Sequence, residues 1–410
     1  MSRALVRSLP LLPGSPLRLR SLVLVASTVL ASGCGSVLVT EVEPEVESVV
    51  DAGPPIDTAR PIVVTSLALA GYRACALTSV GAVKCWGANV AGGTSTAVEV
   101  DGLASGVRAI AVGQNVACAV TEAHTARCWG PNDHGQLGNG SNATSLVPLE
   151  VTGLGPVKMI AAGFYHACAI TSAGAVKCWG ANSHGALGNQ TTTDSAVPVS
   201  VVGLSAGVQA IVAGNDHTCA LTSAGAVKCW GDNASGQLGN NSGAAASVPV
   251  DVVGLSAGVS ALYGGMNSTC AVTPGARLRC WGNGDHGMLG TGVAIDRAVI
   301  PVEPTALPPG ITDLGFGWFH GCGRTPSGGA LCWGANSHGQ LGDGTTRDRT
   351  EPALVQGLES GVSSIAVGQD FSCATLLSGA AACWGRNESS QLGDGTGVDR
   401  ATPVIVQGLP

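Results

Sequence analysis

The sequence is poor in charged and aromatic residues and has no apolar run long enough to span a membrane. Charged side chains make up 11% of its 410 residues and aromatic ones 4%, whereas about a quarter of the residues in an average globular protein are charged. The apolar run Leu22–Ala31 has only ten residues, and a transmembrane helix needs about 20. This composition excludes a polytopic membrane protein and a highly charged disordered chain.

The sequence also lacks an excess of basic residues. Its net charge is −7 at pH 7, whereas nucleic-acid binding normally requires a basic surface. We therefore expect no nucleic-acid partner. Neither an H-E-x-x-H helix nor a Walker loop occurs in the chain, and no pair of catalytic carboxylates stands out. We accordingly predict no catalytic residues, no cofactor and no metal site.

One stretch recurs through most of the chain. It is most complete in His217–Asn240, which reads as a hairpin followed by a glycine-rich turn. Seven copies place tryptophans at Trp86, Trp129, Trp179, Trp230, Trp281, Trp333 and Trp384. The steps between these tryptophans are 43, 50, 51, 51, 52 and 51 residues. A fixed period of this size indicates a repeat architecture.

Each unit of about 50 residues contains four short apolar stretches separated by turn residues. In the fourth unit they are Val208–Gly214, Thr218–Thr222, Ala226–Gly231 and Val248–Val252. Valine, alanine and isoleucine dominate them without helical spacing, which predicts strands. Seven such units predict an all-β fold, a closed seven-bladed β-propeller of four-stranded antiparallel blades over residues 61–410. We expect the fourth strand to join the next blade, so that Pro403–Val406 closes the ring beside Leu67–Ala70.

Fourteen of the 15 cysteines form seven pairs with nine residues between the partners. Folding the fourth copy about Ser223-Ala224-Gly225 places Cys219 directly opposite Cys229, with β-carbons about 4.5–5.5 Å apart. The predicted disulfides are Cys75–Cys85, Cys118–Cys128, Cys168–Cys178, Cys219–Cys229, Cys270–Cys280, Cys322–Cys332 and Cys373–Cys383. Metal binding is the alternative, although this spacing lacks the close pairs of zinc sites. His124 and Ala276 replace the turn glycine in two copies, where we expect different turns.

The remaining cysteine, Cys34, follows a segment with the features of an export signal. Residues 1–21 carry four arginines and no acidic residue, and the apolar run then ends in Ala31-Ser32-Gly33. This junction resembles the lipobox of bacterial lipoproteins, in which the cysteine is lipidated. The resemblance implies a signal peptide over residues 1–33, a lipid on Cys34 and, with Gly35 following it, an exported lipoprotein of the outer membrane that faces the periplasm or the cell surface. The alternative is an ordinary secretory signal followed by a free cysteine.

Residues 34–60 read as a tether between this anchor and the repeats. They hold six acidic residues and three prolines, and such a segment stays extended because it has little apolar surface to bury. Export also bears on the cysteines, because disulfides persist in oxidising compartments.

The repeat Cys-Ala-Leu-Thr-x-x-Gly-x-Val-x-Cys-Trp-Gly-x-Asn-x-x-Gly-Gln-Leu-Gly resembles that of the regulator of chromosome condensation family. The positions that carry the resemblance are Gly214, Trp230, Gly231, Asn233, Gly236, Gln237, Leu238 and Gly239. The first copy departs from it, because it lacks Gln-Leu-Gly and is about eight residues short. The resemblance implies a seven-bladed propeller that binds proteins through loops at one end. We do not extend the nucleotide exchange of the founding member to this chain, because its repeats carry no long insertion.

Several polar residues at repeated positions could suggest chemistry. His134, His184, His286 and His338 lie five residues after a tryptophan, and His166, His217 and His320 lie two before a cysteine. We interpret the first set as turn residues that bond their own loops and the second as packed residues at blade edges. The segments Asp343–Asp348 and Asp394–Asp399 could bind calcium, but we favour Asx turns, because a calcium site needs more oxygen ligands than this spacing guarantees.

Trp318 and Phe319 form an aromatic pair in the sixth copy that suits either an interface or the core. Our leading hypothesis is a monomeric, non-enzymatic scaffold, tethered to a membrane through its N-terminal lipid, that recognises a protein or surface glycan through its loops. The alternatives are a hydrolytic or lyase-type enzyme with a site at the propeller channel mouth, and a structural component of the cell envelope.

Overall fold

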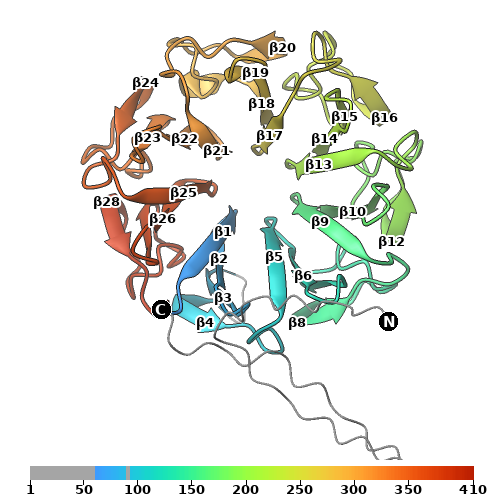
Figure 1. The fold of residues 1–410 in the computed structure, drawn as a ribbon, viewed down its shortest axis with the longest axis horizontal. Coiled ribbons are helices and arrows are strands. Elements are labelled where there is room, and N and C mark those ends of the chain that lie inside the picture. Colours follow the sequence, from blue (N-terminus) through green and yellow to red (C-terminus); the bar gives the residue numbers. More distant parts are fainter. Residues whose placement is uncertain (1–60, 89–92) are drawn as a thin grey trace, which may run out of the picture. The chain divides into compact units, whose positions relative to one another are not determined.

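The computed structural model describes residues 61–88 and 93–410, which form a ring of seven four-stranded antiparallel sheets (Figure 1). Each sheet is one blade, and its four strands are consecutive in the sequence. The predicted all-β propeller is therefore confirmed. Within the described residues the only helical segment is the short 3-10 turn η1 (Asp285–Gly287). The predicted signal peptide, Cys34 and the tether lie outside the described residues.

In each blade the four strands follow one another in order from the central channel to the rim. The innermost strands are β1 (Val64–Ala70), β5 (Val107–Val112), β9 (Val157–Ala162), β13 (Val208–Ala213), β17 (Ala261–Gly264), β21 (Thr312–Phe316) and β25 (Val362–Val367). The second strands are β2 (Arg73–Thr78), β6 (Ala117–Thr121), β10 (His166–Thr171), β14 (His217–Thr222), β18 (Ser268–Thr273), β22 (His320–Arg324) and β26 (Phe371–Leu376).

The third and fourth strands complete each blade. The third strands are β3 (Val83–Gly87), β7 (Ala126–Gly130), β11 (Val176–Gly180), β15 (Val227–Gly231), β19 (Arg277–Asn283), β23 (Ala330–Gly334) and β27 (Ala381–Gly385). The outer strands are β4 (Thr94–Glu99), β8 (Ser145–Glu150), β12 (Ser195–Ser200), β16 (Ala246–Asp251), β20 (Arg297–Val302), β24 (Arg349–Leu354) and β28 (Arg400–Ile405).

The ring does not close as the sequence suggested. β28 pairs with β27 of its own blade, so the prediction that Pro403–Val406 joins the first blade is wrong. The ends meet instead at the rim, where the Gln407 carbonyl accepts a hydrogen bond of 2.9 Å from the Ala97 N–H of β4. Lys84 Nζ also donates to the Gly408 carbonyl at 2.7 Å. The residues after β28 therefore hold the first blade against the last.

The repeated tryptophans form the packing between blades. All seven lie on third strands and are at most 2% exposed. Six of them donate their indole N–H to a main-chain carbonyl of the preceding blade at 2.8–2.9 Å. Trp281, for example, bonds Gln237 and packs with Leu238 in one apolar cluster. Burial of one such ring contributes about 1.5–3 kcal/mol or more, so these contacts account for a large part of the adhesion between blades.

The cysteines pair across the second and third strands as the repeat spacing predicts. Cys219 lies opposite Cys229 in the β14–β15 register, and the same pairing recurs in every blade. The turn between these strands needs a left-handed residue, which is why glycine dominates there. His124 and Ala276 adopt this conformation too, with φ of 62° and 57°. The turn at His124 therefore resembles the others, whereas Gly275 beside Ala276 is also left-handed.

Candidate binding surface at the loop end of the ring

One end of the ring carries the long loops of every blade. We call it the loop end: it comprises the turns between first and second strands, the loops between third and fourth strands, and the strand residues that adjoin them. Asn233 shows how each long loop is held, because its Oδ1 accepts from Leu238 N at 3.0 Å and its Nδ2 donates to Ser242 and Ala244 carbonyls at 2.9 and 3.0 Å. This buried asparagine explains why Asn-x-x-Gly-Gln-Leu-Gly recurs.

The first turns of neighbouring blades are joined around the channel mouth by main-chain hydrogen bonds. Phe164 N donates to Asn215 O at 3.1 Å, and Asn215 N donates to Met266 O at 2.7 Å. Equivalent bonds start from Asn115, Trp318 and Gln369. Because each turn is fixed by its neighbour, the centre of the loop end is a rigid platform.

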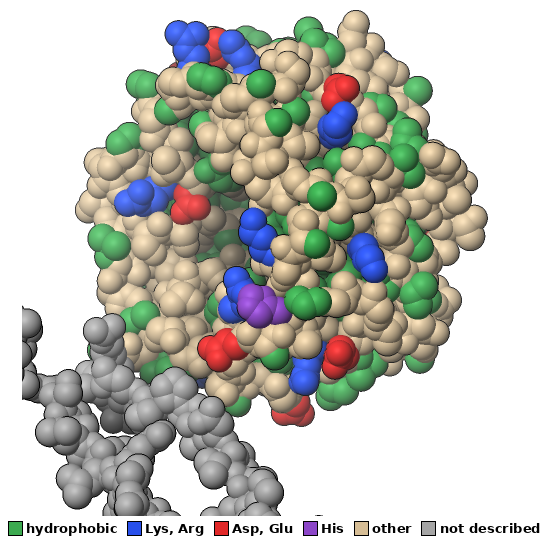
Figure 2. Space-filling model, turned by 45° about the vertical axis from the view of Figure 1, so that its right-hand side comes forward, with side chains coloured by type: hydrophobic (Ala, Val, Ile, Leu, Met, Phe, Trp, Pro, Cys, Tyr) green, Lys and Arg blue, Asp and Glu red, His purple; other side chains and the backbone are tan. Residues whose placement is uncertain are grey.

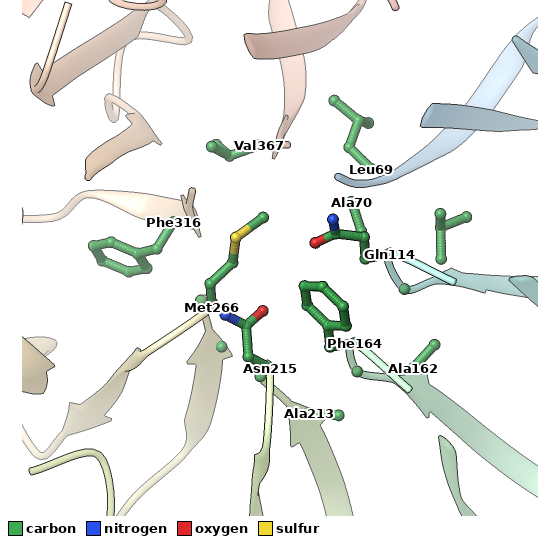
Figure 3. Close-up of a pocket in the computed structure, with 16 residues that line it drawn as sticks. Leu69, Ala70, Gln114, Ala162, Phe164, Ala213, Asn215, Met266, Phe316 and Val367 are labelled. Carbon is green, nitrogen blue, oxygen red and sulfur yellow. The ribbon is translucent and has the colours of Figure 1, made fainter. Parts of the chain in front are cut away.

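The channel mouth is narrow, and apolar side chains, amides and main-chain groups line it. Phe164 and Met266 point into it together with the amides of Gln114 and Asn215 (Figure 3). The cavity there has a volume of about 90 Å³, which holds a few water molecules, whereas sites for small ligands usually measure 300–1,000 Å³. None of the residues that line it is titratable. The channel mouth therefore offers little room or chemistry for a substrate.

Two aromatic pairs lie at equivalent turns of the loop end. Trp318 and Phe319 are half-buried, with ring centroids 6.2 Å apart. Phe164 and Tyr165 form the other pair, at 4.5 Å. Sequence reasoning missed the second pair, although both pairs lie four and three residues before the first cysteine of their repeat. Rigid, partly exposed aromatic rings of this kind commonly anchor protein interfaces.

Three of the four histidines that follow the tryptophans bond the next blade and not their own loops. His134 Nδ1 lies 2.7 Å from Asp194 Oδ2, and His286 and His338 make the same contact with Asp348 and Asp399. Our interpretation of these histidines as self-contained turn residues is therefore wrong for these three, since the partner comes from the next repeat. His184 has no aspartate at the equivalent place and contacts Ser183 Oγ at 3.2 Å.

The second set of histidines is packed between blades, as predicted. His166, His217 and His320 are fully buried, and their Nε2 atoms contact hydroxyls of the next blade at 2.9–3.1 Å. Burial lowers the pKa of His166 and His217 to about 4 and that of His320 to about 3. These side chains are therefore neutral at pH 7 and play a structural role.

The turns between first and second strands contain two aspartates, Asp216 and Asp370, whose carboxylates are partly buried. Burial raises the pKa of Asp216, opposed by the nearby His184, and burial likewise raises that of Asp370. Asp370 contacts Arg386, whose guanidinium stacks over the Tyr72 ring at 5.0 Å. The loop end thus combines acidic groups with aromatic rings around the channel.

The segments considered for calcium are Asx turns. Asp343 Oδ1 accepts from Thr345 N at 3.0 Å, and Asp394 Oδ1 accepts from Thr396 N at 3.0 Å. Within the described residues no three acidic, histidine or cysteine side chains converge as metal ligands. The five-residue pattern Gly-x-Ser-x-Gly, which marks the nucleophile of many hydrolases, occurs at Gly203–Gly207 and Gly254–Gly258. Both copies are exposed turns at the opposite end from the loops and not the strand-to-helix elbow that activates a serine.

The net negative charge of the ring lies at the loop end. The loop end holds twelve carboxylates, those of Asp133, Asp194, Asp216, Asp232, Asp285, Asp296, Asp343, Asp348, Asp370, Glu388, Asp394 and Asp399. It holds six basic residues, Arg73, Arg297, Arg347, Arg349, Arg386 and Arg400. The rest of residues 61–410 carries nine of each sign, including all four lysines. Figure 2 shows a face with acidic and basic side chains interspersed and no block of one sign.

Comparison with known proteins agrees with this geometry. The profile of the family described as the RCC1-like domain matches residues 106–410. The chain belongs to this family. Among solved structures, Prp20p from Saccharomyces cerevisiae superposes with a TM-score of 0.72 at 22% identity, over 81% of this chain and 87% of the yeast chain. At that identity the likeness concerns the fold alone.

Curated members of the RCC1-like domain family match about half of the chain. The ultraviolet-B receptor UVR8 of Arabidopsis thaliana is 30% identical over 202 residues, which are 49% of this chain and 46% of the receptor. The mitochondrial RCC1 domain-containing protein RUG3 of the same plant is 32% identical over 211 residues, 49% of this chain and 47% of that protein. The chain therefore spans less than half the length of these relatives.

The disulfides of the described residues bear on where the chain works. Seven disulfides are characteristic of an oxidising environment outside the cytoplasm. No helix in the part of the chain that the structure describes is long and apolar enough to cross a membrane.

Proposed function

We propose that the protein is a non-enzymatic scaffold, tethered to the outer membrane through a lipid on Cys34, that recognises a protein partner with the loop end of its propeller. The observation that carries this proposal is the coincidence of charge and aromatic surface. The whole excess of six carboxylates lies at the loop end, where Trp318, Phe319, Phe164 and Tyr165 are also partly exposed. A basic partner with an apolar patch fits such a surface, because complementary charge speeds association and aromatic anchors supply affinity.

Family members support a role in protein recognition. Yeast RCC1 (Prp20) has been crystallised with Kap60, and it shares the fold of this chain with a TM-score of 0.71 at 21% identity. A glycan partner would also use aromatic platforms, but it would gain nothing from the acidic excess. The same acidic excess disfavours a nucleic-acid partner.

An enzyme at the channel mouth is a weaker proposal. The cavity of about 90 Å³ has no titratable residue in its lining, and general acid–base or nucleophilic catalysis needs such groups within reach of a substrate. A structural role in the cell envelope stays open to test, because it requires no saturable partner.

The tether is tested separately from binding. Radiolabelled palmitate should enter the wild-type chain and not the Cys34→Ala variant, and the wild type should fractionate with the outer membrane. An unlabelled wild-type chain released freely from cells would contradict the lipid anchor and leave the binding proposal untouched.

Recognition by the loop end is tested by neutralising two carboxylates there and, as a control, two carboxylates at the opposite end. We expect Asp216→Asn/Asp232→Asn to weaken capture of a crosslinked envelope partner at low salt, while Glu150→Gln/Asp251→Asn at the opposite end leaves it unchanged. Equal capture by both variants would count against recognition through the loop end.

A further inference from the structure

Among the residues that the structure describes, the junction between the first and second blades lacks a side chain that the other six junctions have. At the other six junctions a leucine of the long loop packs with a cysteine of its own blade and the tryptophan of the next one. Leu238, for example, lies in one cluster with Cys229, Val252 and Trp281. The first copy has no such leucine.

The three side chains that would surround this leucine line an open groove instead. They are Cys85, Val100 and Trp129, and the groove between β4 and β8 that they line measures about 300 Å³. Its outer rim includes Leu146 and Val147, which are 54% and 49% exposed. A groove of this size accepts one large apolar side chain and part of a main chain.

The groove also has an unused hydrogen-bond donor. Trp129 is 2% exposed, and its indole N–H has no acceptor among the described residues. At the six other junctions the acceptor is the carbonyl of the residue before the leucine. A buried donor left unpaired lowers the stability of the fold, so an acceptor supplied by a bound segment would be favourable.

An acceptor lies on the other side of the groove. At five junctions the N–H three residues after the leucine donates at 2.9 Å to the outer strand of the next blade, as Asn241 does to Val299. The residue equivalent to Val299 in the second blade is Leu146, whose carbonyl receives no such bond within the part of the chain that the structure describes. The Trp129 N–H, the apolar groove and the Leu146 carbonyl thus correspond to the three places that the loop contacts at other junctions.

We propose that the groove between the first two blades binds an extended segment of a partner protein that contains leucine followed by glycine. The carbonyl before the leucine accepts from Trp129, the leucine side chain fills the groove, and the N–H three residues later donates to Leu146. The glycine is needed because, in Gly239, an added Cβ would lie 2.9 Å from Trp281. This groove is at the rim, so it adds a second contact to the one proposed for the loop end.

Charge argues that the occupant is another protein and not the tether of this chain. Glu99 and Asp101 also line the groove, and residues 34–60 carry six carboxylates and a single arginine. Like charges in a partly apolar groove repel one another. A neutral or basic segment is the complementary occupant.

The test uses the mature full-length chain with labelled tryptophans. We would titrate the peptide acetyl-Gly-Gln-Leu-Gly-Asn-Asn-amide, which copies Gly236–Asn241, and follow the indole N–H resonances by NMR. We expect the Trp129 resonance to shift downfield and its exchange with solvent to slow roughly tenfold, because a buried hydrogen bond forms. The peptide with alanine for leucine should bind roughly tenfold more weakly or not at all.

Matched variants separate this groove from the rest of the surface. Val147→Lys should abolish binding, whereas Val197→Lys, at the same position of the third blade where the groove is filled, should not. Grafting Asp232–Ala245 in place of residues 88–93 should reproduce the Trp129 shift without peptide. Loop-end variants such as Trp318→Ala should leave peptide binding unchanged, so failure here is distinct from failure of the proposed function.

Three results would overturn the proposal. The first is a Trp129 resonance that does not move at about 10 mM peptide, which corresponds to less than about 3 kcal/mol of binding free energy. The second is an equal loss of peptide binding in Val147→Lys and Val197→Lys. The third is a Trp129 N–H that is already protected from solvent exchange in the free chain. The last result would show that a segment of the chain itself occupies the groove.

Discussion

At the scale of single residues, the interior of the ring depends on polar side chains that are buried without charge. His217 Nε2 contacts Thr269 Oγ1 of the next blade at 3.1 Å, and burial lowers the His217 pKa to about 4. In the unfolded chain this pKa is near 6.5. Between these two values the unfolded state binds a proton that the folded state excludes, so stability is full above pH 6.5 and falls as the pH drops to about 4.

We predict that His217→Gln flattens this dependence. The variant should lose about 3 kcal/mol less than the wild type between pH 7 and pH 4, because one titrating group is gone. Chemical denaturation at half-unit pH steps measures the difference. Parallel stability curves for the two proteins would show that His217 does not titrate on unfolding.

Unlike the buried neutral histidines, Arg73 is a buried cation. It takes the place of the histidine in the first blade, is 1% exposed, and has a pKa lowered to about 10 by burial. Its Nη2 donates to the Gln114 carbonyl at 2.6 Å, while Nη1 has no partner within the described residues. A buried cation without a carboxylate is costly.

Replacing this arginine should stabilise the ring. We predict that Arg73→His/Ala117→Thr, which copies the His217–Thr269 contact, raises the free energy of unfolding by about 1–2 kcal/mol. Arg73→His alone should gain less, because the histidine would lack its hydroxyl partner. Thermal unfolding of the three proteins decides the order, and a lower melting temperature for the double variant would contradict it.

Some contacts between single residues could be predicted from the sequence, and others could not. Cysteine pairing follows from spacing alone, because a three-residue turn forces Cys219 opposite Cys229. The contact of His134 with Asp194 could not be predicted in the same way, because it joins side chains 60 residues apart. Contacts of that kind depend on how one blade is rotated on the next, and no local pattern encodes this rotation.

At the scale of strands, the outer edge of each blade is protected against pairing. Six outer strands carry proline at one position, namely Pro148, Pro198, Pro249, Pro301, Pro352 and Pro403. Proline removes the N–H that a foreign strand would use. Ala97 stands at this position in β4, and its N–H is the one that bonds the Gln407 carbonyl.

This difference predicts an asymmetric effect of two substitutions. Ala97→Pro should lower the free energy of unfolding by about 1–3 kcal/mol, because it removes the hydrogen bond that joins the ends. Pro249→Ala, the reverse change in the fourth blade, should alter stability by less than about 0.5 kcal/mol. Equal effects in urea denaturation would show that the bond at the seam contributes nothing.

The strand order of each blade followed from the repeat, but the position of the seam did not. Val208–Gly214 and its partners match β13, β14 and β15 closely, because turn glycines mark their ends. Ala97 decides whether the ring closes through β28 or through the residues after it. The sequence shows that the first copy has alanine where the other six have proline, but this difference has meaning only once β4 is known to be an edge strand.

At the scale of the whole molecule, a stiff disc presents one acidic, aromatic end. Each disulfide braces a single blade, and the hydrogen bonds around the channel mouth restrict motion between blades. Rigid surfaces lose little entropy on binding, which favours recognition by preformed loops. The closed ring could be predicted from the number of repeats, whereas the separation of charge could not, because strand direction decides which end each loop occupies.

The most direct test of loop-end recognition is site-specific photo-crosslinking in intact cells. A photoreactive amino acid would replace Phe319 at the loop end or Val202, 38% exposed, at the opposite end. The account predicts one protein adduct of defined mass from position 319, weakened by high salt, and none from position 202. An adduct from position 202 alone, or from neither position, would contradict it.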